Sequence, residues 1–210
     1  MKMIYLDAGT TYSKIIIFNG DNLERKIILS KELRELGLKI TKACGHMAQN
    51  NENEIIALAK GCQGCVDTNA TVLDLGSRDA KWIRFKDGKF HDMDWNTSCA
   101  SSTGATVEML MKFYDVRDLK FNPEKFAVTC GIFGLEKIMD DISGGAPPDK
   151  AVSKFVHGIA YNAWNFAKRP EKLYLSGGFC ENKCFTDSLE NYCELVPLGR
   201  FKLCEGLMYE

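Results

Sequence analysis

Two short segments with the same pattern decide the fold of this chain. The first reads Leu6-Asp7-Ala8-Gly9-Thr10-Thr11-Tyr12-Ser13-Lys14, and the second reads Leu73-Asp74-Leu75-Gly76-Ser77-Arg78-Asp79-Ala80-Lys81. In each segment an apolar strand ends at Asp-X-Gly, a hydroxyl residue follows, and a second strand carries a lysine. This internal repeat predicts two related lobes, each opening with a strand, a turn and a strand.

The first segment carries the groups that a magnesium phosphate needs. Asp7, at the end of a strand, offers oxygen to Mg²⁺, and Gly9 lets the backbone approach a ligand. The hydroxyl groups of Thr10 and Thr11 and the ammonium group of Lys14 can contact phosphate oxygens. A polar hairpin with a glycine is also common in proteins that bind no nucleotide, so this segment alone leaves both interpretations open. The second copy favours the nucleotide, because two facing hairpins can clamp one polyphosphate.

A third segment pairs two glycines between a strand and a helix. It reads Leu175-Ser176-Gly177-Gly178-Phe179-Cys180-Glu181-Asn182. The backbone at Gly177 and Gly178 can lie close to a nucleotide base or sugar. Two adjacent glycines are weak evidence by themselves, and this segment gains weight from its position after the two hairpins.

The rest of the chain alternates between strand and helix patterns, which predicts an α/β protein. Strands are expected over residues 3–7, 13–18, 26–30, 70–75, 81–85, 126–129 and 173–175, and helices over residues 32–38, 53–60, 134–142 and 151–167, with further helices after residues 101 and 182. We expect a first lobe over residues 1–69, completed by residues 190–210, and a second lobe over residues 70–189.

In this order, the three segments resemble the actin, Hsp70 and sugar-kinase superfamily. The resemblance implies a two-lobed actin-like (ribonuclease H-like) ATPase fold, with mixed sheets flanked by helices, which closes over ATP or ADP and Mg²⁺. It assigns Asp7 to Mg²⁺. The other implied nucleotide contacts are Gly9, Thr10, Thr11, Lys14, Gly76 and Ser77 on the phosphates and Gly177, Gly178 and Asn182 around adenosine. The sequence contains no Walker-type lysine loop and no convincing Rossmann glycine fingerprint.

Composition narrows the class of protein. The 210 residues are 45% hydrophobic and 26% charged, which suits a globular chain with a sizeable core. The 27 lysines and arginines nearly balance the 28 acidic residues, so no basic field favours nucleic acid or an anionic membrane. The longest apolar runs are strand-length, and Asp7 comes too early for a signal peptide. We therefore expect a cytoplasmic protein with no nucleic-acid or membrane partner.

Two of the nine cysteines stand immediately before predicted helices, Cys99 and Cys130. The positive end of a helix lowers the pKa of a thiol and favours an anionic metal cluster. Two thiolates cannot complete the four ligands of a cubane, but a twofold dimer would supply four and hold one [4Fe–4S] cluster on its axis. Cys62 and Cys65 form a Cys-X-X-Cys that could bind metal or act as a redox pair, and we assign it no essential role because no second pair follows at zinc-finger spacing.

Three segments resemble a narrower family, the ATPase activators of 2-hydroxyacyl-CoA dehydratases, with the related ATPase subunits of benzoyl-CoA reductases and of double-cubane proteins. They are Asn-X-X-Cys-Ala-X-X-Thr-Gly at residues 96–104, Thr-Cys-X-X-Phe at residues 129–133 and Asp-X-Gly-X-X-Asp-X-Lys at residues 74–81. The resemblance implies a homodimer in which Cys99 and Cys130 hold the cluster. ATP hydrolysis would drive electrons at low potential onto an iron–sulfur dehydratase-like or reductase-like partner, with a ferredoxin or flavodoxin as the donor.

The second hairpin departs from that family. Gly76-Ser77-Arg78 stands where the family usually has Gly-Gly-Gln, which affects phosphate contacts and hydrolysis. The catalytic candidates are Asp7, Asp74 and Arg78. Two other functions remain open: a small-molecule kinase, with Asp7 or Asp79 as the base, and a scaffold that binds ATP without hydrolysing it, which the arginine keeps open.

Overall fold

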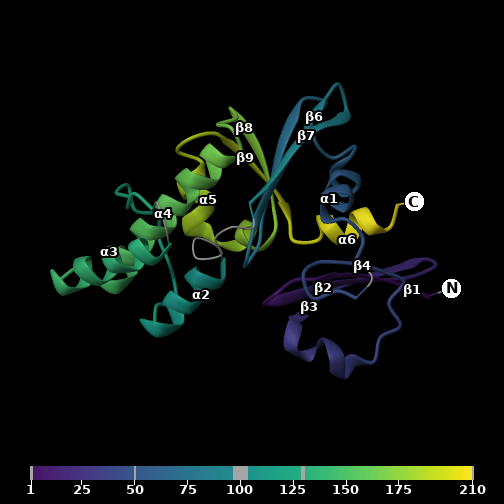
Figure 1. Ribbon diagram of the computed structural model, residues 1–210, viewed down its shortest axis with the longest axis horizontal. Helices are drawn as coiled ribbons and strands as arrows, with labels where there is room; N and C mark the ends of the chain where they lie inside the picture. The colour runs from purple at the N-terminus through teal and green to yellow at the C-terminus, as the bar shows by residue number, and fades with distance from the viewer. Residues whose placement is uncertain (1, 50, 97–103, 129–130, 210) are drawn as a thin grey trace.

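The computed structural model describes residues 2–49, 51–96, 104–128 and 131–209, and the side chains of residues 131 and 132 are not described. The chain forms two mixed sheets flanked by helices, as Figure 1 shows. The α/β, two-lobed class predicted from the sequence is confirmed. The division into residues 1–69 with 190–210 and residues 70–189 stays a prediction.

The first sheet has the strand order β3-β2-β1-β4. Its strands are β1 (Lys2–Ala8), β2 (Tyr12–Asn19), β3 (Asn22–Leu29) and β4 (Lys42–Cys44). The first three are antiparallel neighbours in chain order, whereas β4 pairs parallel to β1. A short 3-10 helix, η1 (Ser30–Leu36), follows β3 where the sequence predicted a helix over residues 32–38, and Gly37 ends it in the left-handed region, with φ of 54°.

The second sheet has the strand order β7-β6-β5-β8-β9. Its strands are β5 (Ala70–Leu75), β6 (Ala80–Lys86), β7 (Lys89–Asn96), β8 (Lys172–Ser176) and β9 (Glu194–Gly199). All six residues of β5 are buried, because helices cover both faces of the sheet. Successive side chains of a strand point to opposite faces, so Val72 packs in one core while Leu73 and Leu75 pack in the other.

One pair of helices lies between the two sheets: α1 (Glu54–Cys62) and α6 (Lys202–Leu207) (Figure 1). They share a core with Ile16 of the first sheet and Val72 of the second. A Cβ atom on Gly61 would collide with the backbone of Lys202, so the helices cross at a distance that only glycine allows.

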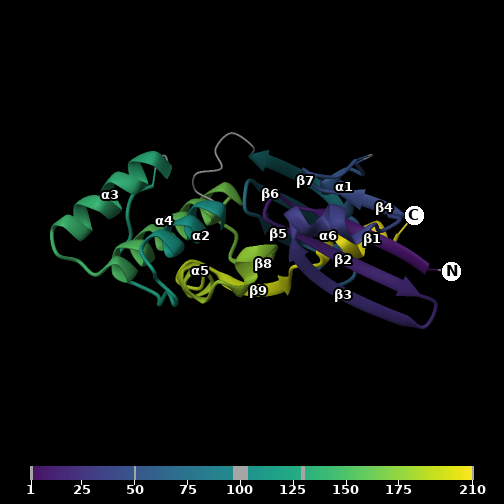
Figure 2. The same ribbon diagram turned by 90° about the horizontal axis from the view of Figure 1, so that it is seen from below.

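The remaining helices cover the other face of the second sheet and extend away from the first sheet, as Figures 1 and 2 show together. They are α2 (Gly104–Phe113), α3 (Gly131–Ser143), α4 (Pro148–Phe166), α5 (Lys183–Leu189) and the 3-10 helix η3 (Gly178–Glu181). The core here is built on α4, in which Val152, Phe155 and Val156 are fully buried. No helix within the described ranges is long and apolar enough to cross a membrane.

Several segments differ from the sequence prediction, among them β4 and α6, which were not expected. The strand expected over residues 126–129 is wrong for its described part, because Phe126 donates its N–H to the carbonyl of Lys154 in α4 and joins no sheet. β9 was not expected, and it pairs parallel to β8 at the edge of the second sheet. Pro197 lies inside β9, and an edge strand tolerates a residue that has no N–H to donate.

Candidate functional site

The turns of the two repeated hairpins face one cavity of about 300 Å³. From the first hairpin, Asp7, Gly9, Thr10 and Lys14 line it. The second hairpin and the glycine segment supply the rest of the predicted set in this cavity, namely Asp74, Gly76, Ser77, Arg78 and Gly177. Gly177 and the residues of the first hairpin, separated by more than 160 positions, therefore line the same cavity.

A second cavity of about 330 Å³ adjoins the first and shares Lys14, Gly76, Ser77 and Arg200 with it. Gly178 and Asn182 line this second cavity. Its other lining comes from α2, η3 and the first hairpin, and it includes the apolar or aromatic Tyr12, Val107, Met111 and Phe179 and the charged Glu108 and Glu181. Thr11 lines neither cavity, and its carbonyl accepts the N–H of Ser30 at 2.9 Å.

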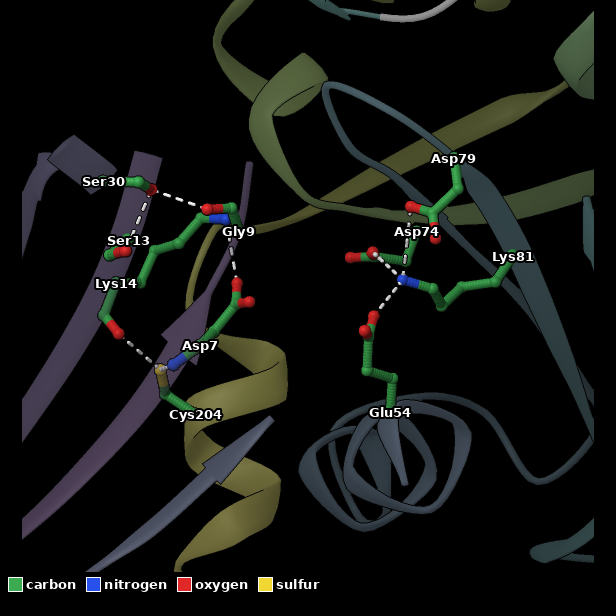
Figure 3. Close-up of polar contacts among 10 residues, drawn as sticks. All are labelled: Asp7, Gly9, Ser13, Lys14, Ser30, Glu54, Asp74, Asp79, Lys81 and Cys204. Atoms are coloured by element: carbon green, nitrogen blue, oxygen red, sulfur yellow. Dashed lines mark hydrogen bonds and ion pairs between the residues drawn. The ribbon is translucent and has the colours of Figure 1, made fainter. Parts of the chain in front are cut away.

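In the first hairpin, an aspartate and a lysine lie directly opposite each other on β1 and β2. Lys14 Nζ donates to Asp7 Oδ2 at 2.8 Å, and Asp7 is 4% exposed (Figure 3). Burial lowers the pKa of Lys14, but the charge and hydrogen bond of Asp7 and the charge of Asp74 together outweigh it, so the pKa is raised. Cys204 of α6 forms a hydrogen bond with each of the two strands. Its Sγ accepts the Asp7 N–H at 3.2 Å and donates to the Lys14 carbonyl at 3.1 Å.

The second hairpin repeats this register with Asp74 opposite Lys81 on β5 and β6. Here the lysine meets three carboxylates (Figure 3): Nζ lies 2.5 Å from Glu54 Oε2, 3.6 Å from Asp74 Oδ2 and 3.6 Å from Asp79 Oδ1. The residue is only 2% exposed. Burial alone would lower the pKa of Lys81, and the surrounding carboxylates instead raise it. Burial raises the pKa of Glu54, with Lys81 opposing that shift.

Two glycines bring backbone to the cavity wall where a side chain would not fit. A Cβ atom on Gly9 would lie 2.6 Å from the carbonyl oxygen of Tyr12. At Gly177 the φ angle is 95°, and a Cβ atom would lie 2.5 Å from the carbonyl oxygen of Leu75. Both positions therefore require glycine, because the protein's own backbone leaves no room for a Cβ atom.

Arg78, at the turn of the second hairpin, reaches across to the other side of the cavity. Its guanidinium donates to Nε2 of His46, which follows β4 of the first sheet, at 2.5 Å. Lys14 and Lys81 are held by the carboxylates described above, and Arg200 is held by Glu181 at 2.8 Å. Among the described cations that line the cavity, Arg78 is thus the one without an ion pair to a carboxylate.

Three ionisable residues that line the cavity were missed by sequence reasoning: His46, Glu54 and Arg200. Glu54 is the first residue of α1, directly after the cap Asn53, whose side chain accepts the N–H groups of Ile55 and Ile56. This cap signal marks the start of a helix. Nothing in the sequence says that the helix starts beside Lys81, because that depends on how α1 packs between the sheets.

The proposed cluster ligands Cys99 and Cys130 lie outside the described residues. Within the described ranges, no group of three or more His, Cys, Asp or Glu side chains is arranged to hold a metal ion.

Comparison with known proteins supports the resemblance predicted from the sequence. No protein-family model matches the chain. The activator of lactoyl-CoA dehydratase from Anaerotignum propionicum is 24% identical over 147 residues, which is 64% of this chain but only 57% of that protein. The (R)-2-hydroxyglutaryl-CoA dehydratase activating ATPase from Acidaminococcus fermentans is 21% identical over 222 residues, covering 88% of this chain and 85% of that protein.

The solved structures agree with these relatives. The activator of the 2-hydroxyisocaproyl-CoA dehydratase from Clostridium difficile, solved with bound ADPNP, matches with a TM-score of 0.78 and 20% identity, over 98% of this chain and 92% of that one. These relatives and this structural neighbour are activators of 2-hydroxyacyl-CoA dehydratases, and the resemblance is confirmed. The chain has the actin-like ATPase fold.

Proposed function

We propose that this chain is an ATP-dependent reductive activator that passes electrons at low potential to an iron–sulfur partner such as a 2-hydroxyacyl-CoA dehydratase. The observation that carries the proposal is the shared cavity, into which both hairpins direct an aspartate and a lysine. The similarity to dehydratase activators supports the choice of partner. ATP hydrolysis is the proposed energy source.

The chemistry of the cavity fits a magnesium nucleotide. Its described lining contains four carboxylates and four cations, so the wall is close to neutral: Asp7, Glu54, Asp74 and Asp79 against Lys14, Arg78, Lys81 and Arg200. A polyphosphate adds several negative charges, which favours binding together with a divalent cation. Asp7 would hold Mg²⁺. The phosphates would contact Gly9, Thr10, Gly76 and Ser77, with adenosine beside Gly178 and Asn182 in the adjoining cavity and beside Gly177 on the wall of the first. Thr11 lines neither cavity and is not among these contacts.

The protein's own ion pairs prepare this site. Lys14 orients the Asp7 carboxylate, and Lys81 Nζ lies 3.6 Å from Asp74 Oδ2. Arg78 has no ion pair with any described carboxylate, so it is the cation best suited to bind an incoming phosphate. Its hydrogen bond to His46 would then be replaced by a contact to the phosphate. Because the hairpins belong to different sheets, one ligand held by both would change how the sheets lie relative to each other.

The electron-transfer part of the proposal rests on Cys99 and Cys130. Two copies of the chain would supply four thiolates to one [4Fe–4S] cluster in a homodimer. When bound, the cluster supplies one-electron redox chemistry. A ferredoxin or flavodoxin would be the electron donor.

Iron analysis of protein purified without oxygen tests this function. We expect about four irons per dimer, a brown colour and ATP hydrolysis. Cys99→Ser and Cys130→Ser should each lose the iron and keep ATP binding, whereas Cys193→Ser, a partly buried cysteine, should keep both. A folded protein that binds ATP but remains free of iron would contradict the electron-transfer role. Transfer of phosphate to a small molecule would instead identify a kinase.

A further inference from the structure

The segment Cys62-Gln63-Gly64-Cys65 ends α1 in a tight turn that the proposed function does not use. Cys65 donates its N–H to the carbonyl of Cys62 at 3.1 Å. Gln63 has φ of −59° and ψ of 127°, and Gly64 has φ of 80°. These are the angles of a type II β-turn, in which glycine takes the position that requires a positive φ.

This turn brings the two cysteines within bonding reach of each other. A β-turn keeps its first and fourth Cα atoms less than about 7 Å apart. Disulfides join cysteines whose Cα atoms lie about 4.4 to 6.8 Å apart. The Cys65 thiol lies over the end of α1 and donates to the backbone carbonyl of Cys62 at 3.1 Å. Little backbone movement is therefore needed to join them.

The two thiols differ in access and in charge. Cys62 is fully buried in the core between the sheets, whereas Cys65 is exposed. The hydrogen bond from Cys62 is the largest cause that lowers the pKa of Cys65 to about 6, and Lys202 adds its charge and a hydrogen bond. Burial of Cys65 and the charge of Glu205 oppose that shift. The same hydrogen bond, with burial, raises the pKa of Cys62.

The packing of α6 against α1 places Lys202 beside the turn. It is the first residue of α6, whose backbone touches Gly61 at the end of α1. Its Nζ also donates to Glu205 Oε2 at 2.7 Å, which holds the side chain beside the turn. An exposed thiol, a buried thiol behind it and an ammonium group are therefore held together by the packing of two helices.

We propose that Cys62 and Cys65 form a thiol–disulfide exchange site whose substrate is a small disulfide. The Cys65 thiolate attacks one sulfur of the substrate, so that a mixed disulfide forms and the first thiolate leaves. Cys62 then loses its proton to a leaving thiolate and attacks the Cys65 sulfur, which forms the Cys62–Cys65 bond and releases the second substrate thiol. In sum, two protein thiols are oxidised to one disulfide, and the substrate disulfide is reduced to two thiols.

Glutathione disulfide is the probe that tests this order of steps on the full-length protein. Peptide mass analysis should find the Cys62–Cys65 disulfide in the unsubstituted protein. Cys62→Ser should stop at the mixed disulfide, with one glutathione on Cys65, and Cys65→Ser should form neither product. Cys193→Ser should behave as the unsubstituted protein does. The proposal is overturned if glutathione in Cys62→Ser is found on Cys65 no more often than on Cys193.

The role of Lys202 as a positioning residue is tested by the pH profile of Cys65 alkylation with iodoacetamide. We expect Lys202→Met to raise the pH midpoint of this reaction by about one unit, since an adjacent opposite charge shifts a pKa by that order. Lys202→Arg should keep the midpoint low, which separates loss of charge from loss of folding. A midpoint in the unsubstituted protein near about 8.5, the value of an ordinary thiol, would also overturn the proposal.

Discussion

The first hairpin (β1–β2) and the second hairpin (β5–β6) place an aspartate opposite a lysine in the same register, yet the two lysines have different surroundings. Lys14 meets one carboxylate, and its side chain is 13% exposed. Lys81 meets three carboxylates, and its side chain is 3% exposed. The repeat visible in the sequence is therefore a repeat of backbone geometry, on which two different electrostatic sites are built.

This difference separates the tasks of the two hairpins. Lys81 is enclosed by Glu54, Asp74 and Asp79 and has a mainly structural task, because removing it would leave three carboxylates together. Lys14 has one partner and more access to the cavity, so it can contact a ligand as well. In the second hairpin, the residue that can contact a ligand is Arg78, at the turn, rather than the lysine.

Lys81→Met should have the largest effect on stability. Removing one partner of a buried ionic cluster costs about 3–5 kcal/mol, because the remaining charges stay buried without compensation. Urea unfolding at neutral pH measures this loss. Lys86→Met, at an exposed position at the end of the same strand, is the control and should change the free energy of unfolding by less than about 0.5 kcal/mol.

The pH dependence of the Lys81→Met protein sharpens the test. Acidification protonates the carboxylates that the substitution leaves unpaired, so the difference from the unsubstituted protein should shrink as the pH falls. A loss below about 1 kcal/mol at neutral pH would contradict the structural task of Lys81.

Lys14→Met should destabilise less and weaken nucleotide binding more. It removes one charged hydrogen bond beside a cavity open to water, for which we expect a loss of about 2 kcal/mol. If Lys14 also contacts phosphate, the substitution removes one charge-assisted hydrogen bond to ATP. ATP affinity, measured by titration calorimetry, should then fall about tenfold. Lys26→Met, an exposed lysine on the neighbouring strand, is the control. A stability loss as large as that of Lys81→Met would remove the distinction between the hairpins.

The hairpins could be predicted from the sequence because their determinants are local. An apolar run, Asp-X-Gly and a second run specify each turn, and glycine is required at Gly9 by its own neighbourhood. The environment of Lys81 could not be predicted, because Glu54 reaches it only through the packing of α1 between the sheets. β9 was missed for a related reason: Pro197 interrupts its pattern, and only pairing with β8 makes it a strand. The cluster ligands Cys99 and Cys130 stay a prediction.

Glu54→Gln should have the smallest effect on the free energy of unfolding. The way this effect changes with pH shows in which direction the pKa of Glu54 is shifted. Burial raises the pKa of Glu54 in the folded protein above its ordinary value of 4.5, although Lys81 opposes this shift. The folded state therefore holds the proton at pH values where the unfolded state has lost it, and the stability of the unsubstituted protein falls as the pH rises through this window. Glutamine does not titrate, so the cost of Glu54→Gln should be about 1 kcal/mol near pH 4.5 and decrease toward pH 7.

Unfolding in urea across this pH range measures that cost, with Glu52→Gln, an exposed neighbour before α1, as the control. A cost that grows with pH would mean that attraction to Lys81 outweighs burial and that the folded pKa of Glu54 lies below 4.5. In that case Glu54 would stabilise the second hairpin as an ion-pair partner at neutral pH. The decreasing cost that we expect instead means that Lys81 holds Glu54 in a buried position where its charge is tolerated, with Asp74 and Asp79 sharing the same cation.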